Sequence, residues 1–172
     1  MHGFASDRLG VSSLARRLAA SGYAVLSFDA SGHGQNRNPF QRSFGRADVF
    51  ENDLAAAVSF LRGHPHVDGE RIAVMGHSMG AGAALDHATR DSGLDAVVLI
   101  SGGWTTWGPH TPRNALFIYA AGDPEPIRER SREIAPHHQH AQRWYCQRCG
   151  GCLDGGERLA GVMACAGRGR NL

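Results

Sequence analysis

The chain has 172 residues, 42% of them hydrophobic and 20% charged, a composition typical of one globular domain with a sizeable core. The formal net charge is +2, and residues 1–135 carry 13 Arg against 14 acidic residues, which excludes a basic surface for nucleic acid. No apolar run approaches the roughly 18 residues of a membrane span, and no signal peptide is visible at Met1. We therefore expect a cytoplasmic protein without a membrane segment.

The first elements in chain order are a helix and a strand. Apolar residues recur at helical spacing over residues 11–18, and Gly22 is the predicted C-cap. Residues 23–28 (YAVLSF) form a nearly continuous apolar run, typical of a strand buried on both faces of a parallel sheet. A loop over residues 29–34 (DASGHG) follows it.

Helices and strands then alternate. A helix after Asp48 carries one apolar face, and buried-type strands are predicted at residues 71–75, 95–101 and 114–121. Only twelve residues separate the last two strands, which leaves room for a short helix but not for a cap domain. This alternation predicts an α/β fold, a three-layer α/β/α sandwich with a mostly parallel sheet.

The most informative stretch is residues 71–85 (RIAVMGHSMGAGAAL), a predicted strand, sharp turn and helix around Ser78. A G-x-S-x-G pattern in this setting is typical of a nucleophile elbow, whose strained turn presents the serine hydroxyl. Side chains at Gly76 or Gly80 would push strand and helix apart. The alternative is a tight turn with an incidental serine.

Four motifs together resemble the α/β-hydrolase family. They are residues 2–4 (HGF), the strand running into residues 29–34, residues 76–80 (GHSMG) and residues 121–123 (AGD), in the family's order. The resemblance covers about residues 1–135 and is closest to lid-poor serine esterases and dienelactone-hydrolase-like members. It implies a small-molecule ester substrate, no cofactor and no metal.

The resemblance also implies residue roles. Ser78 would be the nucleophile, the backbone N–H groups of Phe4 and Met79 would form the oxyanion hole, and Asp123 would orient the catalytic histidine. Glu125 is the reserve acid. The alternatives are an ordinary N-terminal stub for residues 2–3 and a surface turn for Asp123.

Two histidines and two tryptophans near these motifs also have expected roles. His33 and His77 belong to recurring family loops and are expected to be structural. Trp104 and Trp107 follow the strand at residues 95–101 and would either line the acyl pocket or pack on the sheet edge.

Two family features are absent, so we expect a hydrolase domain truncated at both ends. The family's catalytic histidine follows one further strand after the acid, yet no histidine occurs after His140. His137, His138 and His140 are weak candidates for the base because they come so soon after Asp123. The strand that would precede residue 2 is also missing, so the strands at residues 23–28 and 71–75 would either close up or leave a gap.

Residues 136–172 differ from the rest, with seven Gly, five Arg and all four Cys. They contain no aliphatic run able to form the family's last strand, and we interpret them as out-of-frame translation or a disordered tail. The alternative is a zinc or iron–sulfur site at Cys146, Cys149, Cys152 and Cys165. The predicted organisation is a partial hydrolase domain at residues 1–135 and an atypical tail at residues 136–172.

Two functions remain open from the sequence. The first is a serine hydrolase that cleaves carboxylic esters through an acyl-enzyme on Ser78. The second is a catalytically inactive fragment or binding module that retains the elbow but lacks the histidine.

Overall fold

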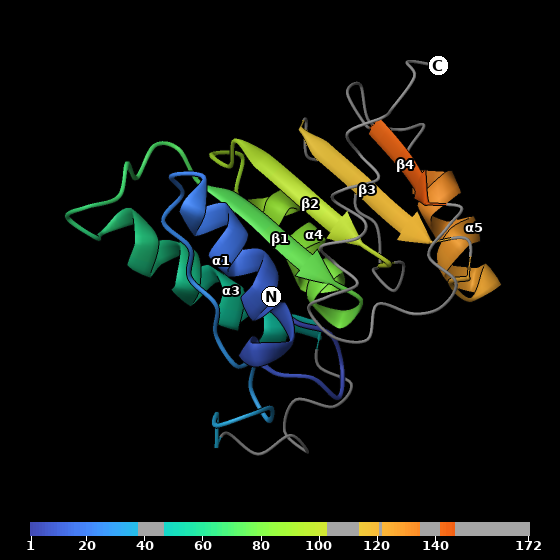
Figure 1. The fold of residues 1–172 in the computed structure, drawn as a ribbon, viewed down its shortest axis with the longest axis horizontal. Coiled ribbons are helices and arrows are strands. Elements are labelled where there is room, and N and C mark those ends of the chain that lie inside the picture. The colour runs from blue at the N-terminus through green and yellow to red at the C-terminus, as the bar shows by residue number, and fades with distance from the viewer. Residues whose placement is uncertain (38–46, 103–113, 121, 135–141, 147–172) are drawn as a thin grey trace.

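A four-stranded parallel sheet forms the centre of the molecule. The structure is a computed structural model that describes residues 1–37, 47–102, 114–120, 122–134 and 142–146. The strands are β1 (Ala73–His77), β2 (Ala96–Ile100), β3 (Ala115–Ala120) and β4 (Gln142–Cys146), and each pairs with the next along the chain (Figure 1). The strands predicted at residues 71–75, 95–101 and 114–121 are confirmed, with ends shifted by one or two residues.

Helices cover both faces of this sheet. One face packs against α3 (Ala47–Arg62) and α4 (Met79–Arg90), and the other against α1 (Ser12–Ala20), which follows the short η1 (Arg8–Val11) (Figure 1). Successive strand residues point to opposite faces, so Leu99 lies in the core under α4 whereas Ile100 packs with Leu14 of α1. The predicted three-layer α/β/α fold is confirmed.

The ends of η1 and α1 follow from local chemistry. The Asp7 carboxylate caps η1 by accepting from the N–H groups of Leu9 (2.8 Å) and Gly10 (3.3 Å). The chain leaves α1 through Gly22, whose φ of +91° is a conformation that glycine adopts without strain. The predicted end of the helix at residues 21–22 is confirmed, with Ser21 as the C-cap and Gly22 directly after it.

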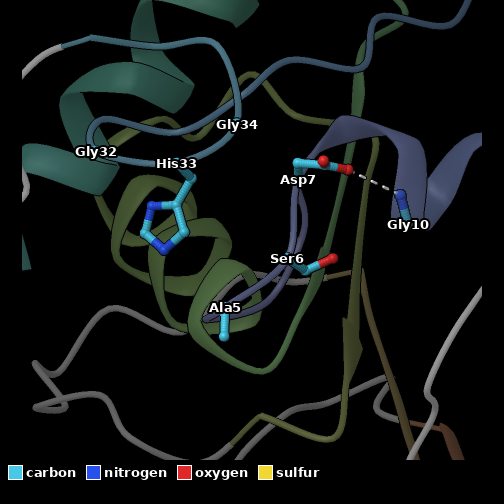
Figure 2. A pocket seen from close by; sticks show the side chains of 7 residues that line it. All are labelled: Ala5, Ser6, Asp7, Gly10, Gly32, His33 and Gly34. Atoms are coloured by element: carbon cyan, nitrogen blue, oxygen red, sulfur yellow. Dashed lines mark hydrogen bonds between the residues drawn. The ribbon is translucent and has the colours of Figure 1, made fainter.

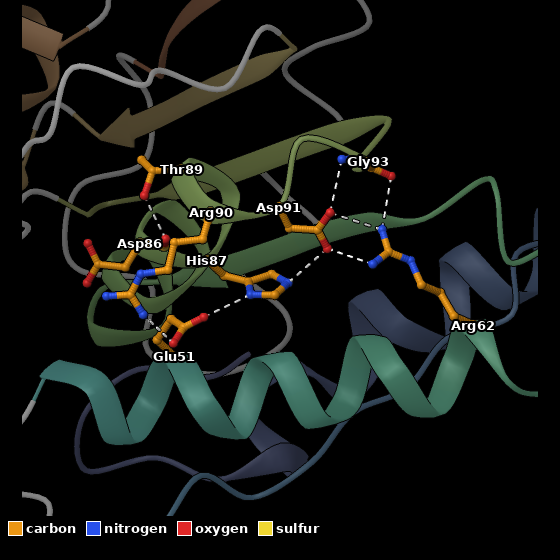
Figure 3. A network of polar contacts seen from close by, with 8 residues as sticks. All are labelled: Glu51, Arg62, Asp86, His87, Thr89, Arg90, Asp91 and Gly93. Atoms are coloured by element: carbon orange, nitrogen blue, oxygen red, sulfur yellow. Dashed lines mark hydrogen bonds and ion pairs between the residues drawn. The ribbon is translucent and has the colours of Figure 1, made fainter.

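A buried polar network joins α3 to α4, the helix that begins just after Ser78 (Figure 3). Glu51 and His87 are both buried, and Glu51 Oε1 lies 3.0 Å from His87 Nδ1 while its Oε2 accepts from Arg90 at 2.6 Å. His87 Nε2 lies 3.4 Å from Asp91, and hydrogen bonds from Arg62 are the main cause that lowers the pKa of Asp91. Because a buried carboxylate is costly unless paired, this network stabilises one orientation of α3 on α4.

The strand expected at residues 23–28 is absent, and that prediction is wrong. These residues form no ladder with a described strand, and Tyr23, Val25 and Leu26 are 65, 39 and 36% exposed. A strand needs hydrogen bonds from a neighbour, and residues 23–28 have no such neighbour in the described sheet. We expected the segments at residues 23–28 and 71–75 either to pair with each other or to leave a gap, and the structure shows residues 23–28 and 73–77 unpaired.

The outer edge of β1 is instead contacted by Met1. Its amino group donates to the Met75 carbonyl, and its own carbonyl accepts from the N–H of His77 at 3.1 Å. Burial lowers the pKa of the Met1 amino group to about 6, since a charged group is poorly solvated there.

A strand does form in the Cys-rich segment, contrary to our expectation. β4 pairs in parallel with β3, from Leu116 opposite Gln142 to Ala120 opposite Cys146. The expectation failed because an edge strand takes its hydrogen bonds from its neighbour and does not need a run of aliphatic residues. The division into residues 1–135 and 136–172 stays a prediction, and residues 147–172 lie outside the described part.

Candidate active site

Ser78 lies in the turn between β1 and α4, at the carboxyl edge of the sheet. Its φ of +51° and ψ of −113° are unusual for a residue with a side chain. Three hydrogen bonds hold this conformation: the Ser78 N–H donates to the Ile100 carbonyl (2.8 Å), and the Ser78 carbonyl accepts from Ala81 (3.0 Å) and Gly82 (3.2 Å). The residue is half-buried.

The two flanking glycines are required by close backbone contacts. A Cβ at Gly76 would lie 1.9 Å from the Gly80 carbonyl oxygen, so strand and helix would have to separate, as predicted. A Cβ at Gly80 would lie 2.6 Å from the carbonyl oxygens of Met1 and His2. A side chain at residue 80 would therefore displace the N-terminal turn, and not the strand as we expected.

The turn of residues 2–4 lies against Ser78. A Cβ built on Gly3 would be 3.3 Å from Ser78 Cβ and 2.8 Å from His77 Nδ1, so this backbone passes within contact distance of the elbow. Met79 is the first residue of α4, and the first N–H groups of a helix are not used by the helix itself. The structure thus brings the segment of the first predicted oxyanion donor, Phe4, next to the elbow that carries the second, Met79.

His2 attaches this turn to the loop at residues 29–34. Its side chain is 1% exposed; Nδ1 lies 2.8 Å from the Gly3 carbonyl oxygen, and Nε2 accepts from the N–H of Ala30 at 3.0 Å. An N–H donor at Ala30 requires an unprotonated Nε2, so the neutral Nδ1–H tautomer fits both contacts. Burial is the main cause that lowers the pKa of His2.

A second contact between the same two loops is formed at Asp29. Its carboxylate accepts from the N–H groups of Arg8 (2.7 Å) and Gln35 (2.9 Å) and pairs with the Arg8 guanidinium. Burial by itself would raise the pKa of Asp29, but these hydrogen bonds and the positive charge hold it below the usual value. A Cβ at Gly34 would lie 2.4 Å from this carboxyl group, so glycine is needed there.

An open hollow of about 530 Å³ lies between these loops (Figure 2). It is lined by Ala5, Ser6, Asp7, Gly10, Gly32, His33 and Gly34. The His33 ring packs against those of His2, Phe4 and Phe50, with centroids 5.2 to 5.9 Å apart, and its Nδ1 lies 3.0 Å from the Ser31 carbonyl oxygen. These packing contacts fit the structural role expected for His33.

Asp123 follows β3 at the same carboxyl edge and is 4% exposed. Its Oδ2 accepts from the Ser101 hydroxyl and from the N–H of Ala120, both at 2.8 Å. The reserve acid, Glu125, instead lies on α5 (Glu125–Ile134), exposed and paired with Arg128. Sequence reasoning missed Ser101, although a polar residue directly after an apolar strand was a usable signal.

No catalytic base can be assigned among the described residues. His137, His138 and His140 lie outside them, as do Trp104 and Trp107. The chain passes from Asp123 through α5 into β4, whose first residue pairs with Leu116 near the start of β3. β4 therefore begins at the amino edge of the sheet, whereas Ser78 and Asp123 lie at its carboxyl edge. No group of three or more metal-ligating side chains occurs in the described ranges.

A parallel sheet between two helical layers, with a strained serine turn after one strand and a buried carboxylate after a later one, defines the α/β-hydrolases. The chain belongs to the serine aminopeptidase S33 family, whose model matches residues 1–121. Within the part of the chain that the structure describes, no helix is both long and apolar enough to cross a membrane.

Curated relatives with similar sequences include a terephthalate ester hydrolase and a cutinase. Bis(hydroxyethyl) terephthalate hydrolase of Streptomyces coelicolor is 29% identical over 152 residues, covering 83% of this chain and 42% of that protein. Cutinase 2 of Thermobifida cellulosilytica is 31% identical over 97 residues, covering 56% of this chain and 35% of that protein. The chain thus spans less than half the length of these relatives.

Solved structures support the fold. Est1E of Butyrivibrio proteoclasticus, solved with ferulic acid, has a TM-score of 0.77 at 14% identity and covers 95% of this chain and 84% of its own. A ferulic acid esterase of Streptomyces cinnamoneus has a TM-score of 0.65 at 25% identity, covering 84% of this chain and 48% of its own.

Proposed function

We propose that this protein hydrolyses carboxylic esters through an acyl-enzyme on Ser78. The observation that carries this proposal is the elbow itself, where a strained, half-buried serine lies against the backbone of Gly3. A serine held in this way can attack an acyl carbon once a base removes its proton.

The remaining roles follow from the positions of the neighbouring groups. The N–H groups of Met79 and Phe4 would donate to the oxyanion, each contributing about 3 kcal/mol to stabilisation of the transition state. The Asp123 carboxylate would orient the base and support its positive charge. One relative is named as a bis(hydroxyethyl) terephthalate hydrolase and one similar solved structure as a ferulic acid esterase, so esters of aromatic acids are the first substrates to compare with acetate.

A catalytically inactive chain is the second candidate, and the position of β4 favours it. β4 pairs with β3, where the resemblance would put the strand before the family's histidine, and residues 147–172 contain no histidine. Loss of the histidine from a serine triad lowers kcat by about 10⁶. The two candidates therefore differ by an amount that is simple to measure.

Hydrolysis of p-nitrophenyl acetate and p-nitrophenyl benzoate by the full chain separates the candidates. We expect Ser78→Ala to abolish activity on both substrates, with Ser21→Ala as a control because Ser21 is exposed and distant in sequence from the elbow. A fluorophosphonate probe should label the wild-type chain and Ser21→Ala, but not Ser78→Ala. Equal hydrolysis by wild type and Ser78→Ala, with no labelling, would show that Ser78 is not a nucleophile and favour the inactive chain.

A further inference from the structure

Ser101, the residue directly after β2, makes a buried contact with the candidate acid. Its side chain is 4% exposed, and its hydroxyl group donates to Asp123 Oδ2 at 2.8 Å. The same oxygen accepts from the N–H of Ala120 at 2.8 Å. Two hydrogen bonds to one oxygen restrict the rotation of the Asp123 carboxylate, and so they also restrict the direction in which its second oxygen points.

The backbone around Ser101 is tied to the nucleophile on one side and to the strand of the acid on the other. The Ile100 carbonyl accepts from the N–H of Ser78, and the Ser101 N–H donates to the Ile118 carbonyl, both at 2.8 Å. A Cβ on Gly102 would lie 2.2 Å from Ala81 Cβ, so the chain passes directly over the first turn of α4. Residues 100–102 thus have little freedom to move relative to Ser78.

Ser101 itself has a φ of +48°, in the left-handed region that glycine adopts more readily. Glycine could provide the same backbone hydrogen bond without this strain. The hydroxyl group is the only hydrogen-bonding feature that glycine at this position would lack.

We propose that Ser101 is a positioning residue, whose hydroxyl holds the Asp123 carboxylate in a fixed orientation relative to Ser78. The proposal rests on the proposed function, in which Asp123 supports the base that activates Ser78. Without the Ser101 hydroxyl, the Ala120 N–H would be the one remaining donor to Oδ2 among the described residues, and rotation about the Asp123 side-chain bonds would become easier. Ground-state binding of the ester would not change.

Three substitutions of Ser101 separate the hydroxyl from the backbone. Ser101→Ala and Ser101→Gly both remove the hydroxyl, and we expect kcat for p-nitrophenyl acetate to fall about ten- to a hundredfold with KM changed less than about twofold. Ser101→Gly also relieves the strain, so its thermal midpoint should be at least that of Ser101→Ala. Ser101→Thr keeps the hydroxyl but adds a β-branch at a positive φ, so stability should fall while kcat stays within about threefold of wild type.

A matched control lies elsewhere in the chain. The Ser31 hydroxyl donates to Asp53 Oδ1 at 2.9 Å, and Ser31 is 3% exposed, so this is a buried serine–aspartate hydrogen bond of the same kind. Ser31→Ala should lower the thermal midpoint by about as much as Ser101→Ala, but kcat should fall much less than in Ser101→Ala because the partner of Ser31 is Asp53 and not the candidate acid. The comparison therefore removes the general effect of losing a buried hydrogen bond.

The outcomes are distinct. Retention of kcat in both Ser101→Ala and Ser101→Gly would overturn the proposal. A kcat that is lost in Ser101→Thr but kept in Ser101→Gly would overturn it too, because the backbone conformation and not the hydroxyl would then be the cause. Failure of the proposed function itself is recognised first, because wild type and Ser78→Ala would hydrolyse the ester equally. In that case Ser101 has no acid to position for catalysis, and this proposal is overturned as well.

Discussion

Two apolar segments of similar sequence character have different structures in this molecule. Residues 96–100 form β2, flanked on both sides by strands and covered by helices, and Val97 is 2% exposed. Residues 23–28 lie beside the sheet without joining it, and Val25 is 39% exposed. An apolar run therefore becomes a buried strand only where a neighbouring strand provides hydrogen bonds to its backbone.

The same contrast organises the candidate site. Ser78 follows β1 and Asp123 follows β3, and both are held by hydrogen bonds to backbone and side-chain groups at the ends of β2 and β3. The turn of residues 2–4 is held by His2, which accepts from the Ala30 N–H, and by Met1, which bonds to the outer edge of β1. We therefore expect substitutions in the paired strands of the sheet to destabilise the whole molecule, and substitutions in residues 23–28 to act locally.

The largest effect should come from Gly76→Ala, at the junction of β1 and α4. The added methyl group would lie 1.9 Å from the Gly80 carbonyl oxygen, a backbone atom that cannot move without separating strand from helix. We expect a loss of about 4 kcal/mol or more in the free energy of unfolding, or no cooperative transition in urea at all. Urea denaturation followed by circular dichroism measures this.

Gly22→Ala is the control for this substitution. Gly22 has a φ of +91°, but no atom lies within 4 Å of an added Cβ. The substitution should therefore introduce backbone strain alone and lower the free energy of unfolding by about 1 to 2 kcal/mol. A Gly76→Ala protein as stable as Gly22→Ala would contradict the close packing of strand on helix at the elbow.

The parts of the fold that sequence reasoning predicted correctly are those whose signals are local. The strand, turn and helix around Ser78 were predicted because apolar runs, glycine spacing and small residues all indicate the same structure. The predictions for residues 23–28 and for β4 were wrong because strand formation there depends on pairing with a distant segment. The residues of one segment do not show whether such a partner is present.

The candidate site divides in the same way. Ser78 and Asp123 could be singled out from motifs, but the Ser101–Asp123 and Glu51–His87 contacts could not, because the partners lie 22 and 36 residues apart in sequence. Side chains at the ends of parallel strands meet only when the sheet is assembled. The oxyanion and acid roles rest on the family resemblance and stay predictions.

A smaller effect is expected at His2, which links residues 29–34 to the turn beside Ser78. Its burial should make the free energy of unfolding depend on pH. Burial lowers the pKa of His2 in the folded protein below the ordinary value of about 6.5. As pH falls below about 6.5, the unfolded chain takes up this proton before the folded chain does, so the free energy of unfolding must fall. The slope is at most about 1.4 kcal/mol per pH unit for one proton, and it ends below the folded pKa.

Urea denaturation between pH 7.5 and 5 tests this, with His2→Gln as the matched variant. Glutamine can keep an acceptor for the Ala30 N–H but does not titrate, so its stability should fall less steeply with acid. The Met1 amino group, whose pKa burial lowers to about 6, titrates in the same range in both proteins and cancels in the comparison. Identical slopes for the two proteins would mean that His2 is not buried in its neutral form.

The smallest effect should come from Val25→Ala, which tests the comparison directly when it is paired with Val97→Ala. Val97 is packed in the larger core, so its substitution should cost about 2 to 3 kcal/mol through lost burial and an unfilled space. Val25 is exposed, and the same loss of two methyl groups should change the free energy of unfolding by less than about 0.5 kcal/mol. Equal costs at the two positions would show that residues 23–28 are packed in solution as a strand of the sheet.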